Sequence, residues 1–228
     1  CSSDLMKLAA TIKLPVPPVH LIQVPETVYI VQRYDRIVLG DTVKCLHQVD
    51  GCQLLGLGQD WKYERQGLVS LKRIVEALRG LQLPAKDLLN FQRWVMFNYL
   101  IGNSDAHAKN ISVLIDETGY ALAPFYDLMC VQVYGDDRLA LFIGDEDQFA
   151  SIGAHSWEAF CEDCGFGVKP TLTLFRKMAN DVAKAWVAVA AQAMADFAPL
   201  PKEVALIHAI TKVIEANCLA AISMTAKR

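Results

Sequence analysis

The feature that most constrains this chain is the stretch from Tyr99 to Ile115, which reads YLIGNSDAHAKNISVLI. It starts at the apolar end of a predicted helix, and Gly102, Asn103 and Ser104 then break the helical pattern. Four residues able to do chemistry follow within six positions, before an apolar run typical of a strand: Asp105, His107, Lys109 and Asn110. Phosphoryl-transfer sites use a carboxylate to orient the attacking hydroxyl and a carboxamide oxygen to hold a metal ion on the nucleotide. The stretch therefore predicts a catalytic loop between a helix and a strand.

A second carboxylate strengthens this interpretation. By itself, the polar loop is also compatible with a turn that merely ends a helix. Asp127 lies in the short apolar segment Pro124–Leu128, just after another strand-like run, where a second metal-binding carboxylate would sit. A metal-dependent hydrolase built on Asp105, His107 and Asp127 is the enzymatic alternative. It would need more ligands than the five dispersed histidines supply.

Composition limits the other classes of function. With 228 residues, 53% of them hydrophobic, the chain can bury a sizeable core as one domain or two small lobes. Its 22 basic and 25 acidic residues give a net charge of −3 without a Lys/Arg cluster, so we expect no direct binding of nucleic acid. No unbroken run reaches the roughly 18 to 20 apolar residues that a membrane span needs, and we expect no membrane contact.

The cysteines favour a reducing compartment. There are seven, an odd and unpatterned set without a secretion signal, which predicts a cytoplasmic protein whose thiols are mostly small core residues. Cys161 and Cys164 form a CxxC pair near His155. Because no second ligand pair follows, two cysteines on a helix face are the better interpretation than zinc.

Periodicity and breakers predict an α+β fold that is predominantly helical and has two small β-hairpins. Asp-rich turns are expected at 135–138 and 144–147. The predicted hairpins cover 19–34 and 111–123, and helices are predicted over 4–12, 42–55, 70–78, 84–100, 128–134, 156–164, from 170 to about Phe197, and 201–224.

At these motifs the chain resembles the HipA family of serine/threonine kinases, the toxins of bacterial toxin–antitoxin pairs. The segment IGNSDAHAKNI, 101–111, resembles that family's catalytic loop, and APFYDL, 123–128, resembles its metal-binding segment. Two weaker matches are RYDR, 33–36, which resembles the segment between the kinase lobes, and HQVDGCQLLG, 47–56. The resemblance implies a protein-kinase-like C-lobe.

The resemblance also implies roles for individual residues, with ATP and Mg²⁺ as cofactors. Asp105 would orient the substrate hydroxyl, and Asn110 and Asp127 would hold Mg²⁺ on the ATP phosphates. Lys109 would meet charge on the transferring phosphoryl group, while His107 would either contact the phosphate or brace the loop. The adenine would meet the segment formed by Gln32, Arg33 and Tyr34, with Tyr34 as a stacking partner.

The chain departs from the family pattern at its start. Neither a phosphate-covering loop nor a strand Lys precedes Arg33, and only Asp4 is acidic where the family's helix Glu would fall. We therefore expect residues 1–36 to be a remnant of the N-lobe, most of it missing. Residues 37–228 would form the helical C-lobe, with catalytic loop 102–110 and metal-binding segment 124–128. Because the phosphates would lack an electrostatic partner, this chain alone should bind ATP weakly and have little kinase activity.

Two classes of function stay open on the sequence alone. In the first, the chain is a fragment of an active kinase that phosphorylates a protein, such as a translation factor or an aminoacyl-tRNA synthetase, and pairs with a DNA-binding antitoxin of the HipB type. In the second, it is a truncated, non-catalytic kinase lobe that acts as an interaction module. Retention of Asp105, Asn110 and Asp127 favours the first.

Overall fold

The computed structural model of this chain describes residues 2–196 and 200–225, and helices dominate it. The helices are α1 Ser2–Thr11, α2 Gly51–Leu54, α3 Leu71–Gly80, α4 Ala85–Leu100, α5 Ala154–Cys164, α6 Val168–Asp196 and α7 Pro201–Thr225. The strands are β1 Val19–Val24, β2 Glu26–Val31, β3 Arg36–Leu39, β4 Thr42–Cys45, β5 His47–Asp50, β6 Ser112–Asp116, β7 Gly119–Leu122, β8 Arg138–Ile143 and β9 Glu146–Gln148. The predominantly helical α+β fold predicted from the sequence is confirmed.

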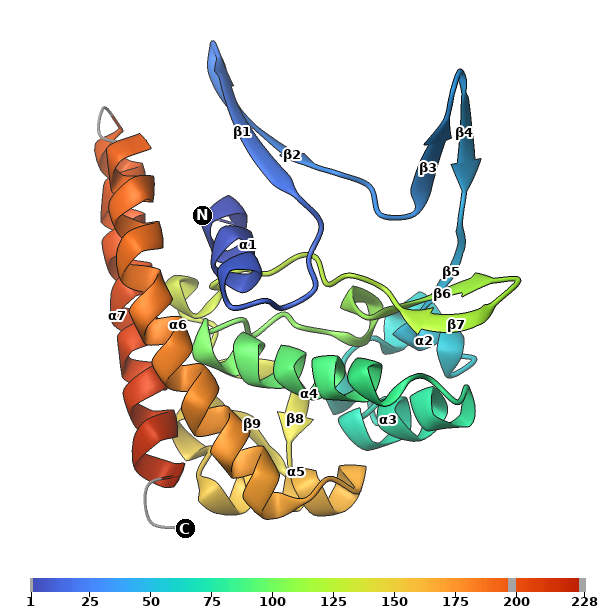
Figure 1. Cartoon of the computed structure of the whole chain (residues 1–228). Helices are drawn as coiled ribbons and strands as arrows, with labels where there is room; N and C mark the ends of the chain where they lie inside the picture. The colour runs from blue at the N-terminus through green and yellow to red at the C-terminus, as the bar shows by residue number, and fades with distance from the viewer. Residues whose placement is uncertain (1, 197–199, 226–228) are drawn as a thin grey trace.

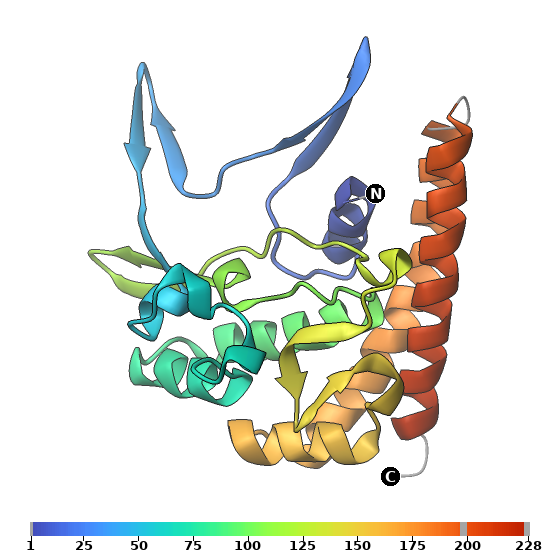
Figure 2. The same cartoon turned by 180° about the vertical axis from the view of Figure 1, so that it is seen from behind.

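Helix α4 crosses the middle of the body, and the long helices α6 and α7 lie side by side along one edge in both views (Figures 1 and 2). Pro84 occupies the N-cap of α4, one position before the first helical residue, and makes no side-chain cap there. The helix buries Phe91 and Trp94, whose rings stack 5.8 Å apart. At its other end the Tyr99 ring stacks on Phe149 at 5.5 Å and meets Trp157 edge-on at 5.8 Å. This aromatic packing fixes the end of α4 from which the polar loop begins.

Gly102 makes the sharp exit from α4 possible. Its φ is +70°, a region that side chains disfavour, and a Cβ there would lie 2.6 Å from Val213 Cγ1 of α7 and 2.8 Å from Gln132 Oε1. Helix α7 also reaches the same turn through Asn217, whose amide donates a hydrogen bond to the Tyr99 carbonyl at 3.0 Å. The C-terminal helix thus packs directly against the start of the loop.

The sheet that ends the loop has three antiparallel strands in the order β5–β6–β7. The predicted hairpin at 111–123 is present as β6 and β7. The helix predicted over 42–55 is wrong: β4 and β5 occupy most of it, and β5 pairs His47–Asp50 with Ser112–Ile115. Only 51–54 is helical, because the Asp50 carboxylate caps that turn by accepting the Gln53 N–H at 2.9 Å.

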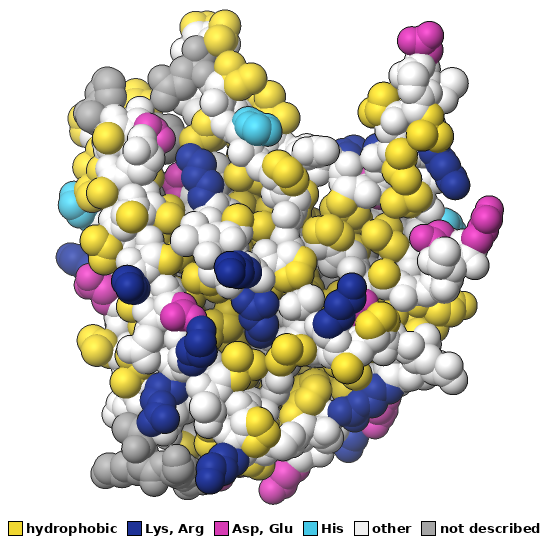
Figure 3. Space-filling view, viewed as in Figure 1, with side chains coloured by type: hydrophobic (Ala, Val, Ile, Leu, Met, Phe, Trp, Pro, Cys, Tyr) yellow, Lys and Arg dark blue, Asp and Glu magenta, His cyan; other side chains and the backbone are white. Residues whose placement is uncertain are grey.

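Two hairpins, β1–β2 and β3–β4, project from the body as separate arms (Figures 1 and 2). The first was predicted and the second was not. Every residue of β2 and β4 is exposed, and the exposed fraction reaches 70% at Val24 and 72% at Val38. Figure 3 shows apolar side chains along both arms and open space between them. The described residues therefore leave the apolar side chains of both arms largely uncovered.

Three further segments differ from the predictions or extend them. The helix predicted at 128–134 is reduced to one 3₁₀ turn, Gln132–Tyr134. The two Asp-rich turns are present: the first precedes β8, and the second joins β8 to β9, a strand pair that was not predicted. Helices α5 and α6 each begin two residues earlier than predicted, and Phe197, the predicted end of α6, lies outside the described residues. The division of the chain at residue 36 falls on the first residue of β3 and stays a prediction.

Among the described residues, α7 is the one helix long and apolar enough to cross a membrane by length and composition. The search for an unbroken apolar run missed it. In the structure α6 packs along it, and the buried side chains include Ile207, Ile210 and Ile214. A helix that packs into a protein core passes the same test of length and composition, so this property alone has little weight.

Candidate nucleotide-binding and catalytic site

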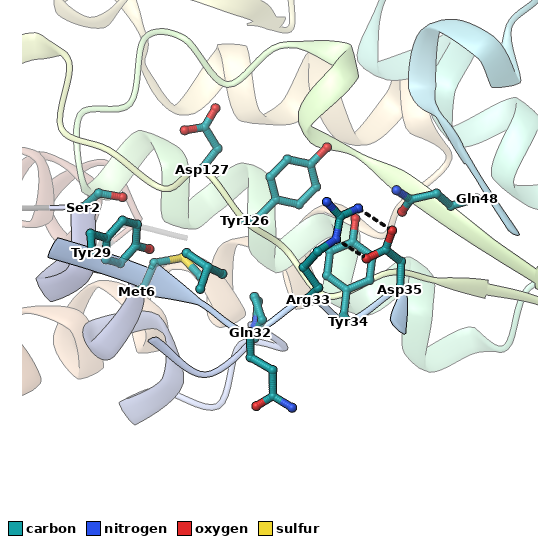
Figure 4. Close-up of a pocket in the computed structure, with 12 residues that line it drawn as sticks. Ser2, Met6, Tyr29, Gln32, Arg33, Tyr34, Asp35, Gln48, Tyr126 and Asp127 are labelled. Atoms are coloured by element: carbon teal, nitrogen blue, oxygen red, sulfur yellow. Dashed lines mark hydrogen bonds and ion pairs between the residues drawn. The ribbon is translucent and has the colours of Figure 1, made fainter. Parts of the chain in front are cut away.

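A cavity of about 430 Å³ lies beneath the segment that joins the two arms (Figure 4). Its lining comes from α1, the segment before β1, β2, the joining segment, β5 and the segment after β7: Ser2, Met6, Pro17, Tyr29, Val31, Gln32, Arg33, Tyr34, Asp35, Gln48, Tyr126 and Asp127. The structure thus brings the three residues predicted to meet the adenine and the predicted metal ligand Asp127 to the walls of one cavity. This is large enough for a small-molecule ligand.

Two tyrosines form one wall of the cavity. The rings of Tyr34 and Tyr126 lie 6.0 Å apart at 32°, and burial raises the pKa of both phenols. Gln48 on β5 is close by, and its buried Oε1 has no hydrogen-bond partner among the described residues. In Figure 4 the Gln32 side chain points away from Tyr126 and Asp127. Because the Gln32 N–H donates to the Pro18 carbonyl at 3.0 Å, the Gln32 carbonyl is the backbone group left to meet a ligand. The wall offers an aromatic surface with one unsatisfied polar atom, Gln48 Oε1, beside it.

An ion-pair cluster fixes the joining segment. Arg33 holds the buried Asp35 carboxylate with two hydrogen bonds, 2.8 Å from Nε to Oδ1 and 2.6 Å from Nη2 to Oδ2. Arg36 adds a third contact to Oδ2 at 2.5 Å. The Arg33 hydrogen bonds, with the charges of both arginines, hold the pKa of Asp35 at about 2. The Arg33 side chain therefore braces the segment.

The predicted metal ligands lie next to each other. Asn110 Nδ2 donates a hydrogen bond to Asp127 Oδ2 at 2.8 Å, and Asn110 Oδ1 accepts one from the His107 backbone N–H at 3.0 Å. Asp127 has a φ of +58°, the left-handed region that few residues other than Gly adopt. This backbone places the Asp127 carboxylate between the cavity and the loop.

Two more hydrogen bonds join the loop to the segment that carries Asp127. The Tyr126 hydroxyl donates to the Lys109 carbonyl at 2.6 Å. Asn103 Nδ2 donates to Asn98 Oδ1 at 2.7 Å and to the Asp127 carbonyl at 3.4 Å. The two sequence motifs, separated by a whole hairpin, therefore form a single hydrogen-bonded unit. Lys109 contributes to it through its backbone.

Asp105 and His107 are held by a residue that the sequence analysis missed. The Tyr63 hydroxyl donates to Asp105 Oδ1 at 2.9 Å across 42 positions, and the Tyr63 ring meets His107 edge-on at 5.6 Å. Burial, with the nearby charge of Lys62, lowers the pKa of His107. The sequence predicted only a connector at 61–64, and no local pattern there indicates this contact. Asp105, His107 and Lys109 are not among the residues that line the cavity.

The side chains that could bind a metal ion favour Mg²⁺ over zinc. Within residues 2–196 and 200–225, no group of three His, Cys, Asp or Glu side chains is placed to hold a metal ion. Cys161 and Cys164 are buried in α5, and burial raises the pKa of Cys164 to about 12, which disfavours the thiolate that zinc needs. Asn110 and Asp127 supply oxygens, and the Asn110 carbonyl has a second lone pair free of the His107 N–H. This pair suits Mg²⁺, which keeps several waters as ligands.

The helical body, the loop between α4 and β6, and the carboxylate beneath the arms are together those of a protein-kinase-like C-lobe. The family model of the HipA-like C-terminal domain matches residues 4–186. This chain therefore belongs to the HipA family.

Curated relatives agree with this family. The chain is 37% identical over 169 residues to Y4mE of Sinorhizobium fredii, whose name describes it as a kinase, with 72% of this chain and 40% of Y4mE covered. It is 34% identical over 151 residues to the serine/threonine-protein kinase toxin HipA of Shewanella oneidensis, covering 59% of this chain and 35% of that protein. The chain thus spans two fifths or less of these relatives.

Solved structures show the same fold. HipA of Shewanella oneidensis, in a complex with HipB and operator DNA, matches 99% of this chain and 56% of its own at 27% identity, with a TM-score of 0.89. The Helicobacter pylori proinflammatory kinase CtkA matches 99% of this chain and 83% of its own at 13% identity, with a TM-score of 0.64. The second match concerns the fold alone.

Proposed function

We propose that this chain is the C-terminal lobe of a HipA-like, ATP-dependent serine/threonine protein kinase and that ATP binds in the cavity beneath 32–35. The hydrogen bond between Asn110 and Asp127 supports this most directly, because it joins the catalytic loop to the wall of the cavity. In this arrangement the adenine meets the backbone of Gln32 and Tyr34, and the phosphates extend toward Asp127. Gln48 offers its unpaired amide oxygen to a nucleotide hydroxyl.

The loop residues then have distinct roles. Asp105 accepts the proton of the substrate hydroxyl or orients that hydroxyl for attack on the γ-phosphate. Lys109 meets negative charge on the transferring group. His107 packs edge-on against the Tyr63 ring and braces the loop. Its lowered pKa favours the neutral imidazole at this position. Asn110 and Asp127 would hold Mg²⁺, which when bound neutralises charge on the phosphates.

The exposed arms support a larger active protein. β1–β4 leave apolar side chains uncovered beside the cavity, and the chain corresponds to 40% of Y4mE. We propose that a further polypeptide segment covers these arms and supplies the phosphate-covering loop. The alternative is a non-catalytic interaction module, which could also use the exposed arms. That alternative does not explain why Asp105, Asn110 and Asp127 are held in place by hydrogen bonds.

The partners follow from the same proposal. The Shewanella oneidensis HipA was solved with HipB and operator DNA, and we propose a HipB-type antitoxin as the partner of this protein too. The DNA contact would belong mainly to that partner, in agreement with a net charge of −3. The substrate would be a protein, such as a translation factor or an aminoacyl-tRNA synthetase, encountered in the cytoplasm.

Phosphate transfer by the intact protein tests the proposal. The protein from the full reading frame should transfer ³²P from [γ-³²P]ATP to protein in the presence of Mg²⁺. Asp105→Ala and Asp127→Ala should each lower the rate by roughly a thousandfold, the size expected for loss of a general base or of a metal ligand. Asp60→Ala, at an exposed carboxylate, is the matched control and should keep the rate. Equal rates in all four proteins would refute the assignment.

The 228-residue chain provides a second comparison. If the cavity needs a covering segment, this chain alone should transfer little phosphate and bind ATP weakly, while the longer protein is active. Full activity of the 228-residue chain would show that the uncovered cavity is sufficient.

A further inference from the structure

The segment around Tyr63 is attached to three residues of the catalytic loop. The Tyr63 hydroxyl donates to Asp105 Oδ1 at 2.9 Å, and its ring lies edge-on against His107 at 77°. The Lys62 carbonyl accepts the Ala108 N–H at 3.2 Å. These contacts join the short link between two 3₁₀ turns, 59–61 and 64–66, to the side of the loop that carries Asp105.

Tyr63 is itself held in place on its other sides. The neighbouring Glu64 accepts the Phe142 N–H of β8 at 2.6 Å, which anchors the segment to the body. The Tyr63 backbone N–H donates to Gln66 Oε1 at 3.1 Å. Two cations stand over its ring, Lys62 Nζ at 4.8 Å and Arg65 at 4.9 Å from the centroid, in a cation–π arrangement. The phenol is therefore a fixed donor and not a mobile surface group.

A fixed donor on one carboxylate oxygen has a geometric consequence. With Oδ1 accepting this hydrogen bond, rotation of the Asp105 carboxylate is restrained and Oδ2 is left for a second partner. Preorganised groups of this kind contribute to catalysis because the reacting geometry does not have to be found anew in each turnover. Tyr63 donates its proton to a hydrogen bond and keeps it throughout.

We propose that Tyr63 is a positioning residue for Asp105 in phosphate transfer, an inference that rests on the proposed function. The substrate oxygen forms a bond to the γ-phosphorus of ATP while the bond from that phosphorus to the β–γ bridging oxygen breaks and ADP leaves. The hydroxyl proton passes to Asp105 Oδ2. Tyr63 holds the carboxylate so that this oxygen faces the substrate, and it touches neither nucleotide nor substrate.

Tyr63→Phe in the intact protein tests this role, because it removes the hydroxyl and keeps the ring packed on His107. With myelin basic protein and [γ-³²P]ATP as probes, kcat should fall about tenfold, the loss expected for one hydrogen bond to a charged group. KM for ATP should be unchanged, since Tyr63 does not line the cavity. The matched control is Tyr134→Phe, at a tyrosine that is 73% exposed, and it should leave both constants unchanged.

Thermal unfolding and crystal structures separate the outcomes. A positioning role predicts an unchanged Tm for Tyr63→Phe together with a turned or mobile Asp105 carboxylate. An active wild type with unchanged kcat in Tyr63→Phe would overturn the inference and leave the proposed function intact. A raised KM for ATP at constant kcat would also overturn it. If the wild-type protein transfers no phosphate and Asp105→Ala is indistinguishable from it, the proposed function fails and this role fails with it.

Discussion

Asn110 and Asp127 meet through a 2.8 Å hydrogen bond, although β6 and β7 separate them in the chain. The hairpin returns the backbone to the loop, and the left-handed turn at Asp127 then directs its carboxylate at the Asn110 amide. A bound cation would be held by the Asp127 carboxylate and by Asn110 Oδ1, the oxygen that accepts the His107 N–H, and not by the Asn110 Nδ2 that makes this hydrogen bond. The backbone conformation at Asp127 is thus part of the candidate metal site.

Replacing Asp127 by Gly and by Ala should separate that conformation from the carboxylate. Both substitutions remove the side chain that would bind Mg²⁺, and both should lower the rate of phosphate transfer by roughly a thousandfold. Asp127→Gly should be about 1 kcal/mol more stable than Asp127→Ala, because a Cβ is disfavoured at a φ of +58°. The free energy of unfolding in urea measures the difference. Equal stabilities would mean that the turn relaxes in the variants.

Gly102 allows a similar separation of backbone strain from steric overlap. Gly102→Ala combines a positive φ with overlap against Val213 and Gln132, and it should cost about 2 to 4 kcal/mol. Gly56→Ala is the matched control: its φ is +66°, but open space surrounds its Cβ, so only about 1 kcal/mol should be lost. The free energies of unfolding of both variants, measured by denaturation in urea, test this difference. Losses of the same size would mean that α7 moves aside freely.

The sequence predicted the parts of this protein whose signals are local. The loop residues lie within six positions, and helices such as α3 and α4 follow their caps and apolar spacing. β5 was missed because its partner, β6, lies more than 60 positions away, so the pairing is a tertiary effect. Tyr63 was missed for the same reason, since nothing near it indicates Asp105 as its partner.

The arms illustrate another limit of sequence reasoning. Their β-branched residues predicted β1 and β2 correctly, but such a pattern normally indicates a strand that is at least half buried. In this chain both faces of β2 are exposed. The β-propensity of a segment indicates whether it forms a strand, whereas the burial of that strand depends on the polypeptide that packs against it.

Glu64 should make stability depend on pH near neutrality. Its side chain is largely buried, and burial raises its pKa from 4.5 to about 7. Between these values the folded state binds more protons than the unfolded state, so stability falls as pH rises through this window. The loss amounts to on the order of 3 kcal/mol between pH 4.5 and 7.

Glu64→Gln keeps an acceptor for the Phe142 N–H and removes the charge. Relative to wild type, this variant should gain stability at pH 8 and show a much smaller difference at pH 5. Urea unfolding at both pH values gives the comparison, and Glu76→Gln, at an exposed carboxylate on α3, is the control. A difference that is the same at pH 5 and pH 8 would show that Glu64 does not titrate in this window.

Asn217 links α7 to the catalytic loop, and its removal should affect both stability and activity. The buried amide donates to the Tyr99 carbonyl at 3.0 Å, at the end of α4 and just before the turn at Gly102. Asn217→Ala removes this hydrogen bond and the one to Gln132 Oε1 at 3.2 Å, leaves the Tyr99 carbonyl with only the Gly102 N–H, and opens a small void, so we expect a loss of about 1 to 3 kcal/mol. Asn180→Ala is the matched control, because its amide also binds a carbonyl, that of Arg176, but on the exposed side of α6.

Because the Tyr99 carbonyl is at the base of the loop, phosphate transfer by Asn217→Ala should also fall, at a temperature where the variant remains folded. Asn180→Ala should change neither the free energy of unfolding by more than about 0.5 kcal/mol nor the transfer rate. Circular dichroism melts and a ³²P-transfer assay on the same preparations test both parts. A destabilised Asn217→Ala with undiminished transfer would show that α7 supports the fold without controlling the loop.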